Sequence, residues 1–382
     1  MTLPAFTFQT ATEILFGRGK AALAPARVAG LGNAVFLVHG ATASRADWLA
    51  NGLGAAGCRV LRHAVAGEPD MAMIEAATAA ARGFGAQVVV SLGGGAAIDA
   101  GKAVAAMVPA TRPLMDHLEV VGRGLPLDLA PLPFVALPTT AGTGAEVTRN
   151  AVIGVPDHRR KVSLRDARML PRLAIVDPAL TDHAPRSLTL ASGLDAVTQV
   201  IEPYISTRAN PLTDALCRTA IPAGLVALQR LMQGEDASAR DALAWVSLCG
   251  GLALANAGLG VVHGLAGPLG GLADAPHGAI CGALLPHGLA QNRLRVTDAG
   301  RAGRIDEVLS WIGDAFGVAA ERGLVALADW SRHHGLPGLR ALGFSSADCD
   351  SAAQAAQSAS SMQANPVPLD LADLRAILAA AA

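Results

Sequence analysis

Four side chains in the second half of the chain are of types that bind divalent metals. Asp195 and Gln199 are four residues apart in a segment that predicts a helix, so both lie on one helix face. His263 lies in an apolar stretch and His277 follows it fourteen residues later. Such groups are costly in apolar helices unless they are paired or ligated. Asp195, His263 and His277 would form a set of two histidines and one carboxylate that leaves positions open on Fe(II) or Zn(II). The alternative is a pair of core histidines that donate to backbone carbonyls.

A glycine-rich segment has the composition of a phosphate-binding loop. It directly follows the apolar run at residues 87–92 and opens a predicted helix. Glycines let a diphosphate approach the backbone, and the helix N-terminus offers free N–H groups. We expect Asp99 in the first helical turn, where it could also bond a cofactor hydroxyl, and Lys102 in solvent or at a cleft edge. The alternative is a tight strand–helix turn, because the segment lacks the GxGxxG and GK[ST] patterns. The loop residues are Gly93, Gly94, Gly95, Ala96 and Ala97.

A second polar loop, residues 138–148, also follows a predicted strand. Its threonines and glycines offer hydroxyls and open backbone to a ribose or a phosphate. An ordinary turn capped by threonines would have a similar composition. Two such loops at the carboxyl ends of parallel strands indicate a dinucleotide site.

The elements that carry these loops alternate between strand and helix in the first part of the chain. Helices at 44–56 and 71–83 separate the first three strands, which predicts βαβ units and a parallel sheet. After residue 178 helices dominate, two of them starting at Asn210 and Asp370. We therefore expect an α/β domain, a helical domain, a boundary near residues 178–185 and an active site in the cleft between them. The strands are predicted at 34–39, 59–64, 87–92, 134–137 and 173–176, with a hairpin at 151–155 and 161–164.

Composition points to an enzyme that acts on small molecules. The 382 residues carry 30 Lys and Arg against 31 Asp and Glu, so we expect neither a nucleic-acid partner nor an anionic membrane. Five scattered cysteines without a CxxC pair argue against disulfides and a zinc knuckle. The uncharged stretch at 242–273 is long enough to span a bilayer, but its eight glycines favour a buried helical hairpin. With no signal peptide visible, we expect a cytoplasmic enzyme.

Several long motifs in order give the chain a specific family resemblance. They are GGGAAIDAGKA at 93–103, PTTAGTGAEVT at 138–148, DP at 177–178, ASGLDA at 191–196, VHGLAGPLGG…PHG within 261–278 and NPVPL at 365–369. Through them the sequence resembles the iron-containing (group III) alcohol dehydrogenase family over nearly its whole length.

The resemblance implies an α/β Rossmann-like N-terminal domain, residues 1–181, and an all-α C-terminal domain, residues 182–382, as in dehydroquinate synthase-like proteins. It also implies NAD or NADP, a divalent metal beneath the nicotinamide, and a small alcohol or aldehyde as substrate. Residues 93–97 would hold the pyrophosphate, and Asp195, His263 and His277 match three of four family metal ligands. Further cofactor contacts are implied for Thr139, Thr140, Thr143, Asn150 and Lys161. We also expect a homodimer.

Three departures from the family pattern bear on mechanism. The fourth ligand, usually histidine, is Gln199, which is a weaker ligand for Fe(II) or Zn(II). Gly267 stands where many relatives carry a histidine that could relay a proton. His39 stands where many NAD-preferring relatives carry an aspartate, so no carboxylate repels a 2′-phosphate and discrimination between NAD and NADP should be weak.

The leading interpretation is a metal-dependent dehydrogenase that passes hydride between an alcohol carbon and the nicotinamide. A metal-free reductase of the same fold, like the maleylacetate reductases, is the alternative that Gln199 supports. Two further alternatives are a lyase resembling dehydroquinate synthase and a nucleotide-binding protein without catalysis.

Overall fold

The computed structural model describes residues 5–382, which divide into two compact units. An α/β unit comprises Gln9–Thr140 and Gly144–Thr181. A helical unit comprises residues 5–8, Ala141–Thr143 and Asp182–Ala382. The predicted division lies between residues 181 and 182. The observed division differs because residues 5–8 and Ala141–Thr143 belong to the helical unit.

A six-stranded sheet forms the centre of the α/β unit, and every neighbouring pair in it is parallel. The strand order is β1-β8-β5-β4-β2-β3. The bounds are β1 Ile14–Phe16, β2 Ala34–Gly40, β3 Arg59–Val65, β4 Val88–Gly93, β5 Phe134–Pro138 and β8 Leu173–Val176. The predicted strands are therefore all present, and β1, which is three residues long, is an addition.

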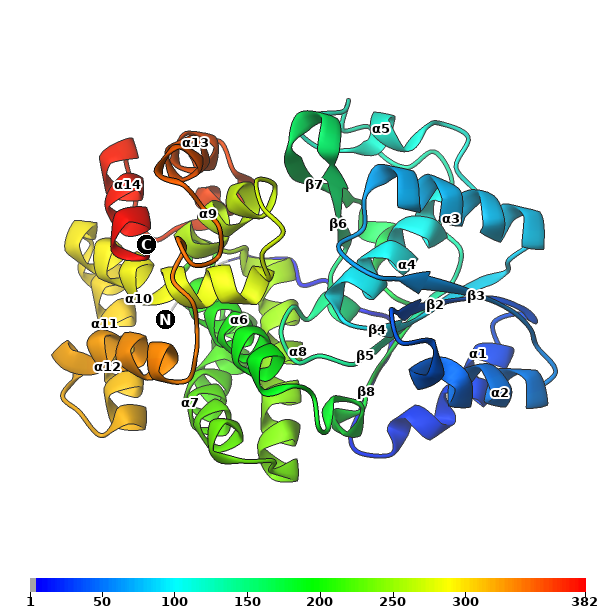
Figure 1. Ribbon diagram of the computed structural model, residues 1–382, viewed down its shortest axis with the longest axis horizontal. Helices are drawn as coiled ribbons and strands as arrows, with labels where there is room; N and C mark the ends of the chain where they lie inside the picture. The colour runs from blue at the N-terminus through cyan, green and yellow to red at the C-terminus, as the bar shows by residue number, and fades with distance from the viewer. Residues whose placement is uncertain (1–4) are drawn as a thin grey trace. The chain divides into compact units, whose positions relative to one another are not determined.

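Helices cover both faces of this sheet. Figure 1 shows α1 and α2 on one face and α3 and α4 on the other. Alternate residues of β2 follow this division: Val35 and Leu37 join one apolar cluster, while Phe36 and Val38 join the other. Burial on both faces explains why the strands read as continuous apolar runs. The helices are α1 Ala24–Ala29, α2 Asp47–Ala55, α3 Met71–Phe84, α4 Gly95–Met107 and α5 Leu114–His117.

The strand order reverses between β2 and β4. From β2 the chain adds β3 on one side, and then returns to add β4 on the other. In open parallel sheets, ligands bind beyond the carboxyl ends of the strands at such a switch point. Gly40 and Gly93 end these two strands, so the glycine-rich loop lies at the position where this fold class binds nucleotides.

A β-hairpin lies outside the main sheet. Its strands, β6 Asn150–Val155 and β7 Arg160–Arg165, are antiparallel and joined by the turn at Pro156–His158, as predicted.

The regular elements of the described helical unit are all helices. Asn210 and Asp370 begin two of them through capping boxes with Thr213 and Asp373, which confirms both predicted starts. The α-helices are α6 Arg186–Ile205, α7 Pro211–Gln233, α8 Ala237–Ala257, α9 Val261–Gly270, α10 His277–Arg295, α11 Ala299–Phe316, α12 Ala320–His333, α13 Ser346–Ala356 and α14 Leu371–Ala380. Short 3₁₀ turns complete the chain at Lys20–Leu23, Ala43–Ala46, Ala145–Val147, Pro156–His158, Ala167–Met169, Pro178–Thr181 and Ser360–Ala364.

The uncharged stretch forms α8 and α9 rather than the predicted hairpin. The two helices meet at 98° because three residues, 258–260, separate them and Gly258 adopts a left-handed φ of 73°. Within residues 5–382, no single helix combines the length and apolarity needed to cross a membrane, although this bent pair meets the criterion jointly.

Candidate functional site

Asp195 lies on α6 where the beginning of α10 packs closely against it. A Cβ atom at Gly278 would lie 2.3 Å from the Ala191 carbonyl oxygen, so glycine allows the two helices to approach this closely. His277 is the first residue of α10. The glycine after it therefore brings the imidazole to Asp195.

His263 is held in the first turn of α9 by Glu202. The Glu202 carboxylate accepts hydrogen bonds from the Val262 backbone N–H at 2.6 Å and from His263 Nδ1 at 2.7 Å. Glu202 lies seven residues after Asp195, on the same face of α6. With Nδ1 donating to Glu202, the Nε2 atom of His263 is left as the ring's free ligand atom.

The side chains of Asp195, His263, His277 and Cys281 converge, and their four ligand atoms all lie within 4.8 Å of one another. Asp195 Oδ1 is 3.4 Å from His263 Nε2 and 3.9 Å from His277 Nε2. His277 Nε2 is 3.5 Å from Cys281 Sγ. Asp195, His263 and Cys281 are buried, whereas the His277 side chain is 34% exposed to solvent. The site can therefore be reached through His277.

This cluster fits a divalent metal. Among the described residues, Asp195 Oδ1 and His263 Nε2 are buried side-chain atoms without a hydrogen-bond partner, since their 3.4 Å contact lacks hydrogen-bond geometry. Leaving buried polar atoms unpaired costs free energy. A bound cation would satisfy both atoms at once.

The same contacts shift the pKa values of the cluster. Burial would raise the pKa of Asp195, but its contacts with the two imidazoles outweigh burial and lower it. Burial would lower the pKa of His263, but interactions with Cys281, Asp195 and Glu202 raise it well above its usual value. An interaction with Cys281, partly offset by burial, raises the pKa of His277 to about 9. A metal must therefore compete with protons for both imidazoles.

The amide nitrogen of Gln199, the predicted fourth ligand, is hydrogen-bonded elsewhere, which leaves the amide oxygen as its ligand atom. Its Nε2 atom donates a 2.7 Å hydrogen bond to the Thr143 carbonyl. Gly250 lies against the same amide, because an added Cβ there would come within 3.2 Å of Nε2. This hydrogen bond connects the segment Ala141–Thr143 to α6.

Two residues of this site were missed by sequence reasoning. Cys281 follows His277 by four residues on α10, and Glu202 follows Asp195 by seven on α6. Both spacings place the residues on the ligand-bearing helix faces, so helical periodicity was the available signal. An isolated cysteine in an apolar helix, however, has the pattern of an ordinary core residue.

The glycine-rich loop forms a narrow connection between β4 and α4. An added Cβ at Gly93 would lie 2.6 Å from Ala97 Cβ and 3.3 Å from the Gly40 nitrogen. One at Gly94, the N-cap of α4, would lie 3.2 Å from Thr140 Oγ1. Thr139 donates its backbone N–H to the Gly93 carbonyl at 2.9 Å. The two predicted loops are therefore neighbours at one edge of the sheet.

The predictions for Asp99 and Lys102 are wrong in detail. Because α4 begins at Gly95, Asp99 lies in its second turn, where one carboxylate oxygen accepts the Val152 N–H at 3.0 Å and the other pairs with Lys102 at 3.2 Å. The Lys102 side chain is fully buried rather than solvated. Its ammonium also donates to Thr148 Oγ1 at 2.8 Å and to the carbonyls of Ala145 and Asn150. This pair ties α4 to β6.

The other predicted cofactor residues lie in both units. Asn150 and Lys161 are on the hairpin, where Lys161 lies 3.7 Å from Glu68 and the Asn150 amide lies 3.5 Å from Ser163. Thr139 and Thr140 follow β5 in the α/β unit, whereas Thr143 belongs to the helical unit, which also contains the cluster around Asp195.

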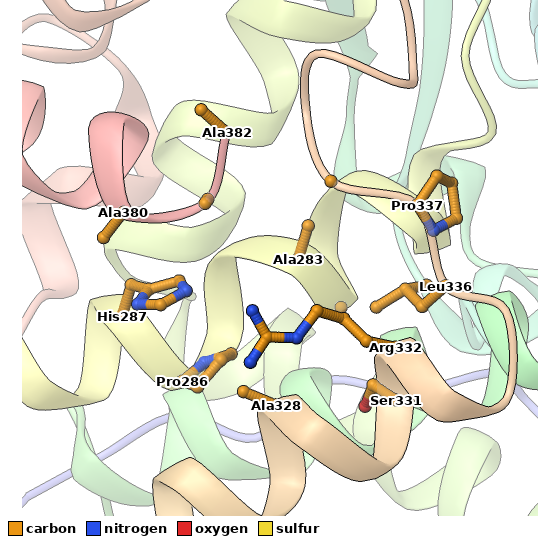
Figure 2. Close-up of a pocket in the computed structure, with 13 residues that line it drawn as sticks. Ala283, Pro286, His287, Ala328, Ser331, Arg332, Leu336, Pro337, Ala380 and Ala382 are labelled. Carbon is orange, nitrogen blue, oxygen red and sulfur yellow. The ribbon is translucent and has the colours of Figure 1, made fainter.

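A separate small pocket of about 50 Å³ lies in the helical unit. Figure 2 shows His287, Pro286 and Arg332 around it. None of the four clustered ligand residues lines this pocket. We therefore assign it no part in the site.

Known proteins match both units. Residues 11–178 match the family described as iron-containing alcohol dehydrogenase, and residues 189–382 match its C-terminal family. The chain belongs to the iron-containing alcohol dehydrogenase family. The predicted family, fold class and enzyme class are thereby confirmed.

Individual members of the family are similar over most of their length. An NAD-dependent methanol dehydrogenase of Bacillus methanolicus is 34% identical over 76% of this chain and 76% of its own. A 1,3-propanediol dehydrogenase of Klebsiella pneumoniae is 37% identical over 68% of this chain and 67% of its own. A crystal structure of 1,3-propanediol oxidoreductase superimposes with a TM-score of 0.89 at 30% identity, covering 99% of this chain and 100% of the other. This member of the iron-containing alcohol dehydrogenase family thus shares the fold of that structure over almost its whole length.

Proposed function

We propose that the protein is an NAD(P)-dependent, metal-dependent dehydrogenase that interconverts a small alcohol and the corresponding aldehyde or ketone. Family membership supports the reaction class. The observation that carries metal dependence is the pair of buried, unpartnered atoms, Asp195 Oδ1 and His263 Nε2, that face each other beside His277. The small substrates in the names of the relatives support a short alcohol.

In the helical unit, Asp195, His263 and His277 would hold the metal. When bound, the metal supplies Lewis acidity that polarises the oxygen of the substrate. Glu202 accepts a hydrogen bond from His263 Nδ1, and so fixes the ring and keeps Nε2 available. Asp195 contributes negative charge that partly neutralises the cation.

In the α/β unit, Gly93 and Gly94 leave the backbone open for the cofactor diphosphate at the N-terminus of α4. The nicotinamide accepts or supplies the hydride. Thr139 and Thr140 lie next to this loop and offer hydroxyl and backbone groups to the same ligand. Asp99 and Lys102 contribute by bracing α4 against β6.

The alcohol proton has no histidine to accept it at position 267. An added Cβ at Gly267 would meet no atom within 4 Å, so the space for a larger side chain is open. We propose that the proton leaves through water or a ribose hydroxyl.

We also propose weak discrimination between NAD and NADP. His39 is buried at the end of β2, and its Nδ1 lies 2.8 Å from the Gly40 carbonyl. No carboxylate stands at this position to repel a 2′-phosphate. Strict NAD preference, by a factor of about a thousand or ~4 kcal/mol in kcat/KM, would contradict this proposal.

The test is turnover of a panel of short alcohols and aldehydes with each nucleotide, before and after metal removal. We expect activity that a chelator abolishes and Zn(II) or Fe(II) restores. Activity that ignores the chelator would instead identify a metal-free reductase of the same fold. The matched variants are His263→Ala, which should lose activity, and His287→Ala, which should keep it because His287 lies in the separate pocket.

Finally, we propose a cytoplasmic homodimer. All five cysteines are free in the structure, which suits a reducing compartment. Light scattering of the purified chain would establish its oligomeric state, and fractionation of the producing cells would establish its location.

A further inference from the structure

The metal-binding cluster contains a fourth ligand atom other than the one expected at position 199. Gln199 commits its amide nitrogen to the Thr143 carbonyl at 2.7 Å. Cys281 lies with Asp195, His263 and His277, and all four ligand atoms are within 4.8 Å of one another. Cys281 is fully buried on α10, one helical turn from His277.

Three of the separations in the cluster are close to those around one small cation. Zinc binds imidazole nitrogen at about 2.0–2.1 Å and thiolate sulfur at about 2.3 Å, so neighbouring ligands of a tetrahedral ion lie roughly 3.3–3.6 Å apart. The distances here are 3.4 Å from Asp195 to His263 and 3.5 Å from His277 to Cys281. The 3.9 Å from Asp195 to His277 requires a shift of only a few tenths of an ångström.

We propose that Cys281 Sγ is the fourth protein ligand of the metal in this chain, and that the resulting Asp–His–His–Cys set selects Zn(II) over Fe(II). The proposal rests on the metal site of the proposed function and specifies its composition; the substrate oxygen would enter as a fifth ligand, an expansion that catalytic zinc allows. A thiolate is a softer ligand than an amide oxygen or an imidazole, and soft ligands favour zinc. Cys281 releases its thiol proton to solvent when the ion binds, and the Cys281 sulfur then forms the bond to the metal.

Glycines allow this arrangement. A Cβ at Gly282 would lie 2.7 Å from Leu194 Cδ1, and one at Gly278 would lie 2.3 Å from the Ala191 carbonyl oxygen. These two residues flank the turn that carries Cys281 and keep it against α6. The cysteine is thus positioned toward Asp195 by the same close packing that positions His277.

The experiment uses the full chain stripped of metal and loaded with Co(II) as a spectroscopic probe. A cobalt–thiolate bond gives charge-transfer absorption in the near ultraviolet, and ligation by nitrogen and oxygen alone does not. We expect this band in the unmodified chain at one ion per chain. We expect Cys281→Ala to lose the band, and to bind Zn(II) about 10–100-fold more weakly. Its preference for Zn(II) over Fe(II) should also fall.

Cys217→Ala is the matched control, because Cys217 is also fully buried in a helix of this unit but lies outside the cluster. It should keep the band and the affinity, as should Gln199→Ala. X-ray absorption at the zinc edge of the unmodified chain should show one sulfur ligand at about 2.3 Å, which requires no variant to fold.

Two results would overturn this proposal alone. One is stoichiometric Co(II) binding without the band, which would leave the metal-dependent dehydrogenase intact but assign its fourth ligand elsewhere. The other is a band that survives in Cys281→Ala. If no ion binds and turnover ignores a chelator, both this proposal and metal dependence are wrong.

Discussion

At the scale of single residues, the candidate site depends on polar atoms in apolar surroundings. Asp195 and His263 are each less than a tenth exposed, and their facing atoms lack partners. Glu202 is equally buried, but it is satisfied by Val262 and His263. A bound cation would therefore give Asp195 and His263 the partners that they lack, whereas the Glu202 carboxylate already has its hydrogen bonds.

Replacing Glu202 should weaken metal binding without removing a ligand. In Glu202→Gln the hydrogen bond to His263 Nδ1 loses its charge and the ring loses its fixed orientation, so we expect Zn(II) affinity to fall about 10–100-fold. Competition titration with a chromophoric chelator measures this. Asp306→Asn, which removes a surface contact to Arg293, is the control and should bind normally. Equal affinities in the two variants would show that Glu202 does not position the ligand.

Glu146 should make stability depend on pH in the α/β unit. Burial raises its pKa from 4.5 to about 7. Between these values the unfolded chain loses the proton and the folded chain keeps it, so stability is full below pH 4.5 and falls as pH rises to 7. The loss amounts to about 3 kcal/mol.

We therefore expect Glu146→Gln to match the unmodified chain near pH 4.5 and to exceed it by about 2–3 kcal/mol at pH 8. Urea unfolding at several pH values tests this. The exposed Glu75→Gln is the control and should show no such divergence. A constant difference between Glu146→Gln and the unmodified chain at all pH values would exclude the proposed titration.

At the scale of elements, helix packing brings the ligands together. Gly278→Ala would place its Cβ against the Ala191 carbonyl oxygen and push α10 from α6. We expect a loss of about 1–3 kcal/mol in the free energy of unfolding and weaker Zn(II) binding. Gly267→Ala on α9 is the matched control, because its Cβ meets open space, and it should be neutral or stabilise by about 0.5–1 kcal/mol. Similar stability of the two variants would argue against the close approach at Gly278.

A substitution in the connection between β4 and α4 should weaken cofactor binding. Gly94→Val would add a branched side chain beside Thr140, where the diphosphate must approach. We expect NADH affinity to fall at least about tenfold, or ~1.4 kcal/mol, in a fluorescence titration. Gly83→Ala, exposed on α3 with open space around it, should bind as the unmodified chain does. Undiminished binding by Gly94→Val would remove this loop from the cofactor site.

The helices and strands were largely predictable from the sequence, but the side-chain contacts between them were not. The run at residues 34–39 is apolar and bounded by glycine, so it predicted β2 to within a residue. β1 is only three residues long and was missed. The sequence predicted a solvated Lys102 because its hydrogen-bond acceptors lie 43–48 residues away along the chain. These acceptors are Ala145, Thr148 and Asn150. Such contacts depend on tertiary packing, which local patterns do not encode.

The same limit applies to the candidate site. Asp195, His263 and His277 were chosen because their residue types are unusual in apolar helices. The approach of Cys281 to Asp195 and the Gln199–Thr143 hydrogen bond depend on tertiary packing, which the sequence does not show. Residue type indicated the candidate chemistry, and packing added Cys281 to the candidate ligands.

At the scale of the whole molecule, the proposed function assigns a separate ligand to each unit. A ligand that binds only the folded state stabilises it by RT ln(1 + [L]/Kd), about 2.7 kcal/mol at a hundredfold excess over Kd. We expect Zn(II) to protect amides of α6, α9 and α10 in hydrogen exchange, and NAD to protect amides around β4 and α4. His263→Ala should abolish the first effect and leave the second. Protection by Zn(II) confined to the α/β unit would contradict the assigned metal site.

The enclosure of Lys102 has a consequence for chemical labelling. The chain has only three lysines, and Lys20 and Lys161 are not buried. An amine-reactive acylating reagent therefore meets one enclosed ammonium among very few targets. Its rate of reaction at Lys102, read by mass spectrometry, should report how often α4 separates from β6. The cofactor should slow that reaction, since a ligand at the N-terminus of α4 holds the same helix in place. The extent of acylation at Lys102 would thus measure how often the α/β unit opens at this position.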